Sequence, residues 1–124
     1  MTFHAIRAAS AATVVAASLC TSAPAVAQSF DGQWSVTIMT RRGACDPAYR
    51  IGVLIRGSQV YYLGGGGVNV SGRVARSGAV SVAVASAGQS ASGSGRLRGN
   101  VGSGVWRGQG SAGVCSGVWS ASRG

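Results

Sequence analysis

Apolar and polar residues alternate along most of the chain after residue 27. Residues 34–38 alternate Trp, Val and Ile with Ser and Thr, and residues 80–84 carry Val at every second position. Because successive side chains of a β-strand point to opposite faces, this alternation predicts half-buried strands. The other predicted strands are residues 51–55, 60–63, 68–74, 94–98, 105–107 and 114–121.

Short turn signals separate these predicted strands. Gly57-Ser58 is a two-residue hairpin signal, 76–78 and 87–90 are turns, and 64–67 is a run of glycine that breaks the pattern. Residues 89–95, rich in Ser and Gly, are a candidate mobile stretch. The chain is therefore predicted to be all-β, an antiparallel meander of seven or eight short strands that forms a small barrel or a sandwich.

Glycine accounts for 21 of the 124 residues, and no helical stripe follows residue 27. Glycine disfavours helices, and at alternate strand positions it permits tight curvature or close backbone approach. A disordered Gly/Ser linker is the competing interpretation. The regular Val alternation argues against it, and so do Trp34, Trp106 and Trp119, whose large rings are suited to pack over small neighbours in a thin core.

The first 27 residues have the pattern of a secretory signal peptide. Arg7 makes the start positive, and residues 8–20 form an apolar stretch of about 13 residues, whereas a membrane-spanning helix needs about 20. Pro24 breaks this helix, and Ala25-Val26-Ala27 is a small-residue cleavage site. We therefore expect a signal helix that is removed after residue 27, one β domain in residues 28–124 without a transmembrane segment, and a periplasmic or extracellular location.

Two cysteines, Cys45 and Cys115, remain after residue 27. An even number of cysteines in an exported chain indicates a disulfide. This bridge would close a loop of about 70 residues and contribute about 4 kcal/mol on the chain-entropy model. A reactive thiol pair and an intermolecular bridge are the alternatives, and the absence of a C-x-x-C spacing favours the structural bridge.

Side chains that perform acid–base chemistry are nearly absent. The single His, His4, lies in the predicted signal peptide, and the only two acids are Asp31 and Asp46. Both acids are in turn-like contexts, where their side chains usually bond to nearby backbone amides. Because no Ser-His-Asp or Cys-His arrangement and no ligand cluster can be assembled from residues 28–124, we expect neither an enzyme nor a metal site.

Arginine is the main functional signal of the sequence. The formal net charge is +9, and all 11 Lys or Arg positions are Arg. Six arginines lie opposite the apolar faces of the predicted strands and are expected to make one side of the sheet basic: Arg50, Arg56, Arg73, Arg96, Arg98 and Arg107. Such a field attracts anionic polymers, for example lipopolysaccharide or polysaccharide. A solubility coat is the alternative, and the scarcity of aromatic residues argues against nucleic acid as a partner.

Tyr61 and Tyr62 are adjacent, so their rings must point to opposite faces of the strand. A Tyr phenolate close to Arg is able to hold haem iron and the haem carboxylates, which makes these two residues candidate haem ligands. Packing and a simple hydrogen bond are the plainer explanation of both rings.

Several Gly-, Ser- and Val-rich segments carry a resemblance to known proteins. They are residues 70–74, 77–82, 91–97, 102–106 and 115–119. With them the chain resembles small exported Gram-negative Gly-rich β-proteins of unknown function, loosely labelled haem utilisation or adhesion exoproteins. The resemblance implies export and brings no catalytic or ligand residues with it. In addition, Gly32-Gln33-Trp34 is similar to the G-x-W opening of lipocalin-like barrels, which favours a barrel.

Three hypotheses of function follow. The first is a non-enzymatic envelope or extracellular protein whose basic face binds an anionic surface polymer or a protein partner. The second is a carrier of a small ligand, with haem as the named candidate. The third is a periplasmic inhibitor of a secreted hydrolase.

Overall fold

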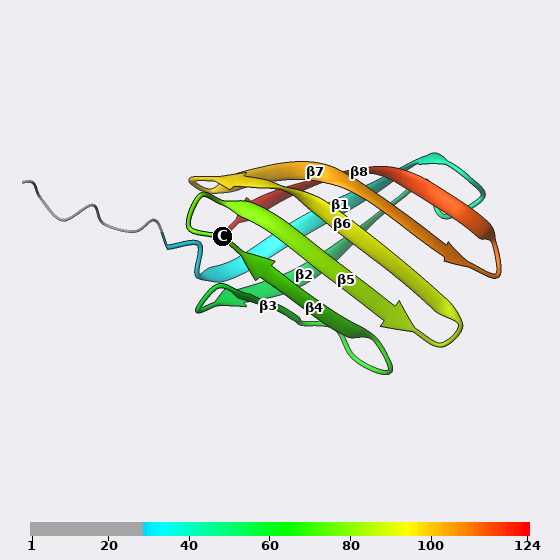
Figure 1. The fold of residues 1–124 in the computed structure, drawn as a ribbon, viewed down its shortest axis with the longest axis horizontal. Coiled ribbons are helices and arrows are strands. Elements are labelled where there is room, and N and C mark those ends of the chain that lie inside the picture. Colours follow the sequence, from blue (N-terminus) through cyan, green and yellow to red (C-terminus); the bar gives the residue numbers. More distant parts are fainter. Residues whose placement is uncertain (1–28) are drawn as a thin grey trace, which may run out of the picture.

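The computed structural model describes residues 29–124, and the predicted signal peptide, residues 1–27, lies outside this part of the chain. Antiparallel strands follow one another in sequence order, and the last pairs with the first to close a barrel (Figure 1). The strands are β1 (Gly32–Arg42), β2 (Ala48–Arg56), β3 (Gln59–Tyr62), β4 (Asn69–Val74), β5 (Ala79–Ser86), β6 (Gln89–Arg98), β7 (Val101–Gly110) and β8 (Gly113–Arg123). The predicted all-β meander is confirmed, and of the two predicted architectures it is the barrel. Among the described residues, no helix is long and apolar enough to cross a membrane.

The turn between β2 and β3 is the two-residue hairpin that the sequence predicts. Gly57 and Ser58 both have positive φ, 56° and 68°, as a type I′ turn requires, and Arg56 pairs with Gln59 across it. The pairing between the next two strands, β3 and β4, is shorter. The ladder between β3 and β4 holds one pair, Gln59 with Arg73, beside a bond from the Val74 N–H to the Ser58 carbonyl.

Strand β6 corrects the prediction for the Ser- and Gly-rich stretch. Residues 89–95 were predicted as part of a turn and a candidate mobile segment, with a strand only from residue 94, but they belong to a strand of 10 residues. This strand pairs with β5 on one side and β7 on the other along its length. Its inward positions include Ala91, Gly93 and Gly95, so the alternation is present but is carried by residues too small to give a hydrophobic signal.

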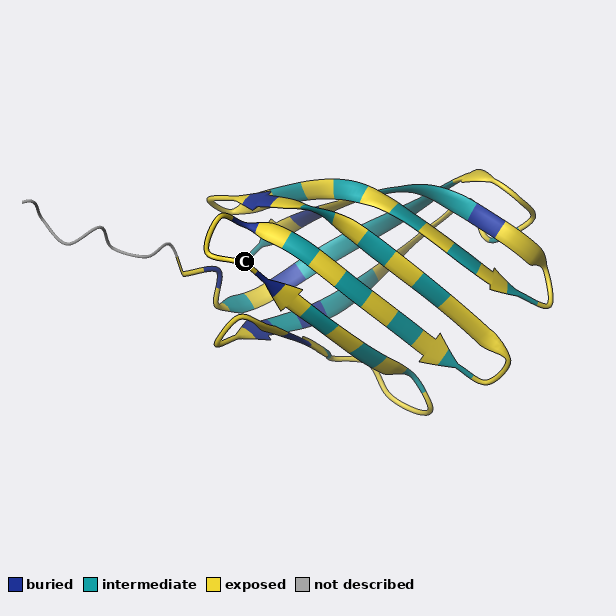
Figure 2. Ribbon diagram, viewed as in Figure 1, coloured by how far each residue is buried: buried dark blue, intermediate teal, exposed yellow. Residues whose placement is uncertain are grey.

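Most buried residues lie at one end of the barrel, called the closed end below, while the buried Cys115 lies at the other end (Figure 2). The β2–β3, β4–β5 and β6–β7 turns lie at this end together with the C-terminus (Figure 1). The buried apolar cluster consists of Phe30, Trp34, Val53, Ile55, Val60, Val74, Leu97 and Ala121. Phe30 precedes β1, and its carbonyl accepts a hydrogen bond of 2.8 Å from the Trp34 indole. The segment before the first strand therefore plugs the closed end.

Arg123, at the end of β8, fastens this plug. Its guanidinium carbon lies 5.2 Å from the centre of the Trp34 ring, within cation–π range. Its N–H groups donate to the backbone oxygens of Ser29, Asp31 and Gly99 and to the Asn100 side-chain oxygen. A planar fork with five donors suits such a set of acceptors. One side chain thus ties the N-terminal segment, the first and last strands and the β6–β7 turn together.

Candidate ligand-binding cavity

A cavity of about 610 Å³ occupies the barrel interior beyond the closed-end cluster. It reaches the opposite end of the barrel, called the mouth below, where the loops 43–47, 63–68, 87–88 and 111–112 lie (Figure 1). Side chains in the middle of the barrel, such as Val36 and Val82, point inward and yet are only partly buried, because they face this space. A barrel of eight strands either fills its interior with side chains or holds one small ligand, and this interior is not filled.

One wall of the cavity is aliphatic. It is contributed by β1, β2, β4 and β5, and its lining residues are Val36, Ile38, Ile51, Val53, Ile55, Val70, Val80, Val82 and Val84. All of them are β-branched. Such side chains have restricted χ1 rotation, so this wall is a stiff apolar surface.

The facing wall, made by β6, β7 and β8, consists largely of glycine. In β7 the inward positions are Gly102, Gly104, Gly108 and Gly110 on either side of Trp106. At Gly102 and Gly104 the absence of a Cβ atom lets Leu97 and Trp119 lie directly against the backbone, whereas Gly108 and Gly110 line the cavity itself.

Trp119 of β8 lies over this glycine wall. A Cβ atom at Gly104 would come within 2.6 Å of its Nε1, and one at Gly93 would lie 3.7 Å from the same atom. The indole N–H donates to the Ser94 carbonyl at 3.2 Å. The ring therefore reaches from β8 across β7 to β6, and glycine is what lets it approach the backbone.

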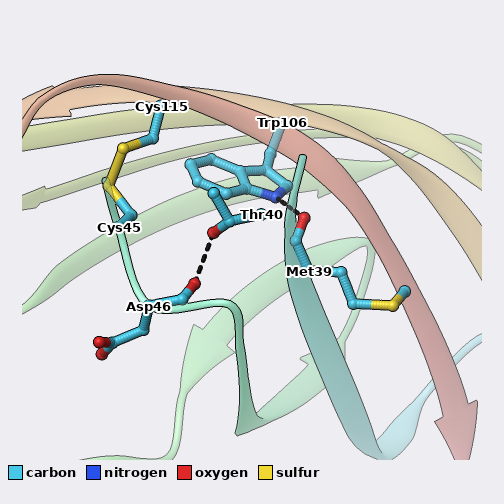
Figure 3. The surroundings of a disulfide bond; sticks show 6 residues. All are labelled: Met39, Thr40, Cys45, Asp46, Trp106 and Cys115. Atoms are coloured by element: carbon cyan, nitrogen blue, oxygen red, sulfur yellow. Dashed lines mark hydrogen bonds between the residues drawn. A yellow bond between two sulfur atoms is a disulfide. The ribbon is translucent and has the colours of Figure 1, made fainter. Parts of the chain in front are cut away.

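Trp106 of β7 lies over the wall in the opposite direction. A Cβ atom at Gly117 would come within 2.9 Å of its Nε1. Its indole N–H donates to the Met39 carbonyl of β1 at 3.1 Å (Figure 3). The prediction that Trp rings pack over Gly is confirmed for both residues.

A disulfide between Cys45 and Cys115 ties the β1–β2 loop to β8 at the mouth (Figure 3). It is the intramolecular bridge that the sequence predicts. The same loop is held from within, because Thr40 donates through its hydroxyl to the Asp46 carbonyl at 2.6 Å and through its N–H to the Pro47 carbonyl at 2.9 Å. One side of the mouth is thus fixed in place.

Polar side chains gather at the rim of the cavity. They are Asp46, Tyr49, Ser86, Gln89 and Ser111, and Asp46 is the one charged residue among those that line the space. Burial raises the pKa of the Tyr49 phenol above its ordinary value of 10.0, and the nearby Asp46 carboxylate raises it further. Hydrogen-bonding groups are therefore available at the mouth, while the interior is mainly apolar.

The structure separates the two candidate haem ligands. Tyr62 lines the cavity. Tyr61 lies on the outer surface, where 46% of it is exposed and its hydroxyl donates to the Gln59 side chain at 2.7 Å. Only one member of the predicted pair faces the space where a ligand would lie.

The six candidate anion-binding arginines are all exposed on the outer surface. They lie on β2, β4, β6 and β7, so closing the sheet distributes Arg50, Arg56, Arg73, Arg96, Arg98 and Arg107 around the barrel instead of along one flat side. A subset shares one end of the barrel. This subset, the closed-end arginines, consists of Arg56, Arg73, Arg96 and Arg98, joined by Arg76 of the β4–β5 turn.

The two acids lie far apart in the fold. Asp31 is at the closed end, where its carboxylate accepts a bond of 3.1 Å from the Gly57 N–H, and Asp46 is at the mouth. They therefore form no carboxylate pair. In the part of the chain that the structure describes, no three His, Cys, Asp or Glu side chains gather in a way that could hold a metal ion.

The sequence interpretation missed the cavity itself. It assigned the glycines to tight curvature or close backbone approach, and close approach is what the structure shows at Gly104. It placed the Trp rings in a filled core. The available signal was the position of the glycines, since they recur on the inward face of β6, β7 and β8 where a packed barrel carries larger apolar residues. Comparisons of the chain with protein-family models, curated proteins and solved structures found no match.

Proposed function

We propose that the protein binds and carries a small apolar molecule inside its barrel. The observation that supports this is the cavity of about 610 Å³ between the closed-end cluster and the mouth. Ligand sites in proteins have volumes of roughly 300–1,000 Å³, are lined mainly by apolar side chains and carry a few placed polar groups. The interior matches that description, and the polar groups lie at its rim.

The energetics of a small domain favour the same proposal. An unfilled interior costs stability, because lining atoms lose packing partners. A domain of this size buries a limited share of its surface and has little stability to spare. This barrel nevertheless keeps the space open and ties its mouth with a disulfide. Such an arrangement is suited to an occupant that restores the missing contacts.

The test is a titration of the oxidised protein, without its predicted signal peptide, with the neutral dye N-phenyl-1-naphthylamine. We expect saturable binding with increased dye emission. Val84→Phe adds a ring inside the cavity and is expected to weaken binding about tenfold, as overpacking displaces a ligand. Val105→Phe adds the same ring on the outer face of β7 and serves as the control. Absence of saturable binding, or equal loss in both variants, contradicts the proposal.

Haem is a specific ligand to include in this test. Tyr62 is the one residue of the predicted pair that lines the cavity. If haem is the cargo, its Soret band shifts on binding, the shift persists at moderate salt, and Tyr62→Phe removes it while Tyr61→Phe does not. A shift that salt abolishes, or one that both variants retain, argues against haem as the occupant of the barrel.

A second candidate function is attachment to an anionic polymer of the cell envelope. The supporting observation is that the closed-end arginines come from neighbouring hairpins at the same end and are all exposed. Their combined field attracts phosphate-rich polymers and is screened by salt. With the closed end attached, the mouth would face away from the polymer.

Binding to lipopolysaccharide tests this second function. Replacing Arg56 and Arg98 with Gln at the closed end is expected to weaken binding, and salt should weaken it in the same way. The matched control replaces Arg41 and Arg107 with Gln, which removes the same charge near the mouth. Equal loss in the two double variants contradicts a site at the closed end.

A further inference from the structure

We propose that the preferred ligand of the cavity is an uncharged, flat ring system that stacks on Trp119 and Trp106. This inference rests on the proposed carrier function and goes further, because it names the chemical class of the ligand. Three observations support it. The indole N–H groups are already hydrogen-bonded, the wall that faces the indoles is stiff and aliphatic, and the lining carries almost no charge.

Both indoles have already used their hydrogen-bond donors. Trp119 donates to the Ser94 carbonyl and Trp106 to the Met39 carbonyl, and both carbonyls belong to the barrel wall. Tryptophan has no other donor and no strong acceptor. What these residues offer to the cavity is therefore the apolar surface of their rings.

The glycines beneath the rings fix how the rings lie. Trp119 rests against Gly104 and Trp106 against Gly117, each so closely that a Cβ atom would clash with the ring, and Gly93 lies in ordinary contact range of Trp119. The hydrogen bond from each indole Nε1 to a carbonyl of the wall holds the ring there. The rings thus form a broad aromatic surface on the β6–β8 wall, and aromatic surfaces prefer offset stacking with other flat rings.

The opposite wall restricts the shape of a ligand. In the closed strand order, β4 lies across the barrel from β8, and it presents Val70 together with Val82 of the adjacent β5. These β-branched side chains are stiff. A rigid flat molecule gains contact with both walls without losing rotamer freedom, whereas a flexible alkyl chain loses entropy when it is held.

The interior disfavours ionised ligands, because its lining holds almost no charged side chains. Among the described residues no charged side chain is buried, and Asp46 at the rim is the one charged residue of the lining. An ionised group deep in such a site loses its hydration without gaining a partner. A neutral polar substituent, in contrast, finds partners at the mouth in Ser86, Gln89 and Ser111. The ligand is therefore a neutral ring system with its polar end towards the mouth.

A matched set of ligands tests the shape and the charge separately. The set is 9-anthracenemethanol, its anionic analogue 9-anthracenecarboxylate, and 1-tetradecanol as a flexible neutral chain of similar size. Affinity is measured by displacement of N-phenyl-1-naphthylamine. We expect the methanol to bind about tenfold more tightly than the carboxylate, from desolvation of the charge, and about fivefold more tightly than tetradecanol, from stacking.

Substitution of the aromatic surface supplies a second readout. Trp119→Leu keeps an apolar side chain but removes the ring, and it is expected to weaken 9-anthracenemethanol about fivefold while tetradecanol changes less than twofold. Trp106→Leu is the second variant, for the case that the first does not fold. Tyr61→Leu removes an aromatic ring from the outer surface and is the control.

The outcomes separate this inference from the proposed function. Tighter binding of tetradecanol, or equal loss of both neutral ligands in Trp119→Leu, overturns the preference for flat rings while leaving a carrier of apolar molecules. Tighter binding of 9-anthracenecarboxylate or of haem overturns the requirement for a neutral ligand. If neither the dye nor any ligand binds, the proposed function fails and the inference fails with it.

Discussion

Individual glycines determine how the interior of this barrel packs, because the lack of a Cβ atom lets a neighbouring ring or strand approach the backbone closely. Gly104 is the clearest case. A Cβ atom there would lie 2.6 Å from the Trp119 Nε1 and 2.7 Å from the Gly95 Cα. The Trp ring could lie on the wall only if this position has no side chain. One residue thus links a backbone contact to the aromatic surface of the cavity.

Gly104→Ala should therefore destabilise the protein. Overpacking of this kind costs about 1–3 kcal/mol, as the ring or the strand must shift. Gly65→Ala is the control, because nothing lies within 4 Å of a Cβ atom there. Urea unfolding of the two variants measures the difference. Similar unfolding free energies would contradict the described packing of Trp119.

Replacing Arg123 should also destabilise the protein. Arg123→Gln removes the cation–π contact with Trp34 and the guanidinium bonds to the Ser29 and Asp31 carbonyls, which we expect to cost about 2 kcal/mol. Arg98→Gln, an exposed arginine of the same end, is expected to change stability by less than about 0.5 kcal/mol. Equal decreases of the thermal unfolding midpoint in the two variants would contradict the role of Arg123 in holding the N-terminal segment against the closed end.

Tyr49 gives the protein a dependence on alkaline pH. Its raised pKa means that the folded state holds the phenolic proton more tightly than the unfolded state. The stability from this group is complete below the ordinary pKa of 10.0 and is lost as the pH rises through the higher folded pKa. Tyr49→Phe should therefore reduce the decline of unfolding free energy above pH 10, and Tyr61→Phe should not. An unchanged decline in Tyr49→Phe would show that another group is responsible.

Strands with strong side-chain alternation could be predicted from the sequence, and strands of small residues could not. In β1 and β5 the alternating Val, Ile and Trp predict both the strand and its inward face. In β6 the alternating residues are Ser, Ala and Gly, so the sequence of this strand resembles that of a flexible linker. That stretch is ordered by pairing with β5 and β7, a tertiary cause that a local pattern does not contain.

The disulfide acts on the element that borders the mouth. Its cysteines are 70 residues apart, so reduction should cost about 4 kcal/mol on the chain-entropy model. The change is measured by urea unfolding with and without reductant, and the Cys45→Ser/Cys115→Ser double variant should match the reduced wild-type protein. A loss below about 1 kcal/mol would contradict the role of the bridge as the main long-range staple.

Closure of the sheet into a barrel determines which side chains face the interior and which face the solvent. The sequence predicts meandering strands, but the choice between barrel and sandwich depends on the pairing of β8 with β1, which joins the two ends of the domain. Closure converts the arginines of a supposed basic face into a distributed outer charge with a concentration at one end. It also places the inward glycines of β6, β7 and β8 beneath packed side chains or at the surface of the cavity.

The barrel is therefore divided along its axis into a packed part and an open part. The closed end holds the buried cluster and the plug, which supply the hydrophobic stabilisation. The other end holds the cavity and the tied mouth. The floor of the cavity is formed by residues of the buried cluster, such as Trp34, Val53 and Leu97. Substitutions nearer the mouth, such as Val84→Phe, are therefore the ones expected to alter affinity without preventing folding.

Methyl NMR of the valines during titration with N-phenyl-1-naphthylamine shows directly whether a ligand enters the barrel. The chain has valines on both faces of the same barrel, which makes the experiment its own control. We predict that the methyl signals of Val36, Val82 and Val84 inside the cavity shift on binding, while those of Val101 and Val105 on the outer surface do not. Shifts confined to the outer valines, or none at all, would contradict a ligand-binding barrel.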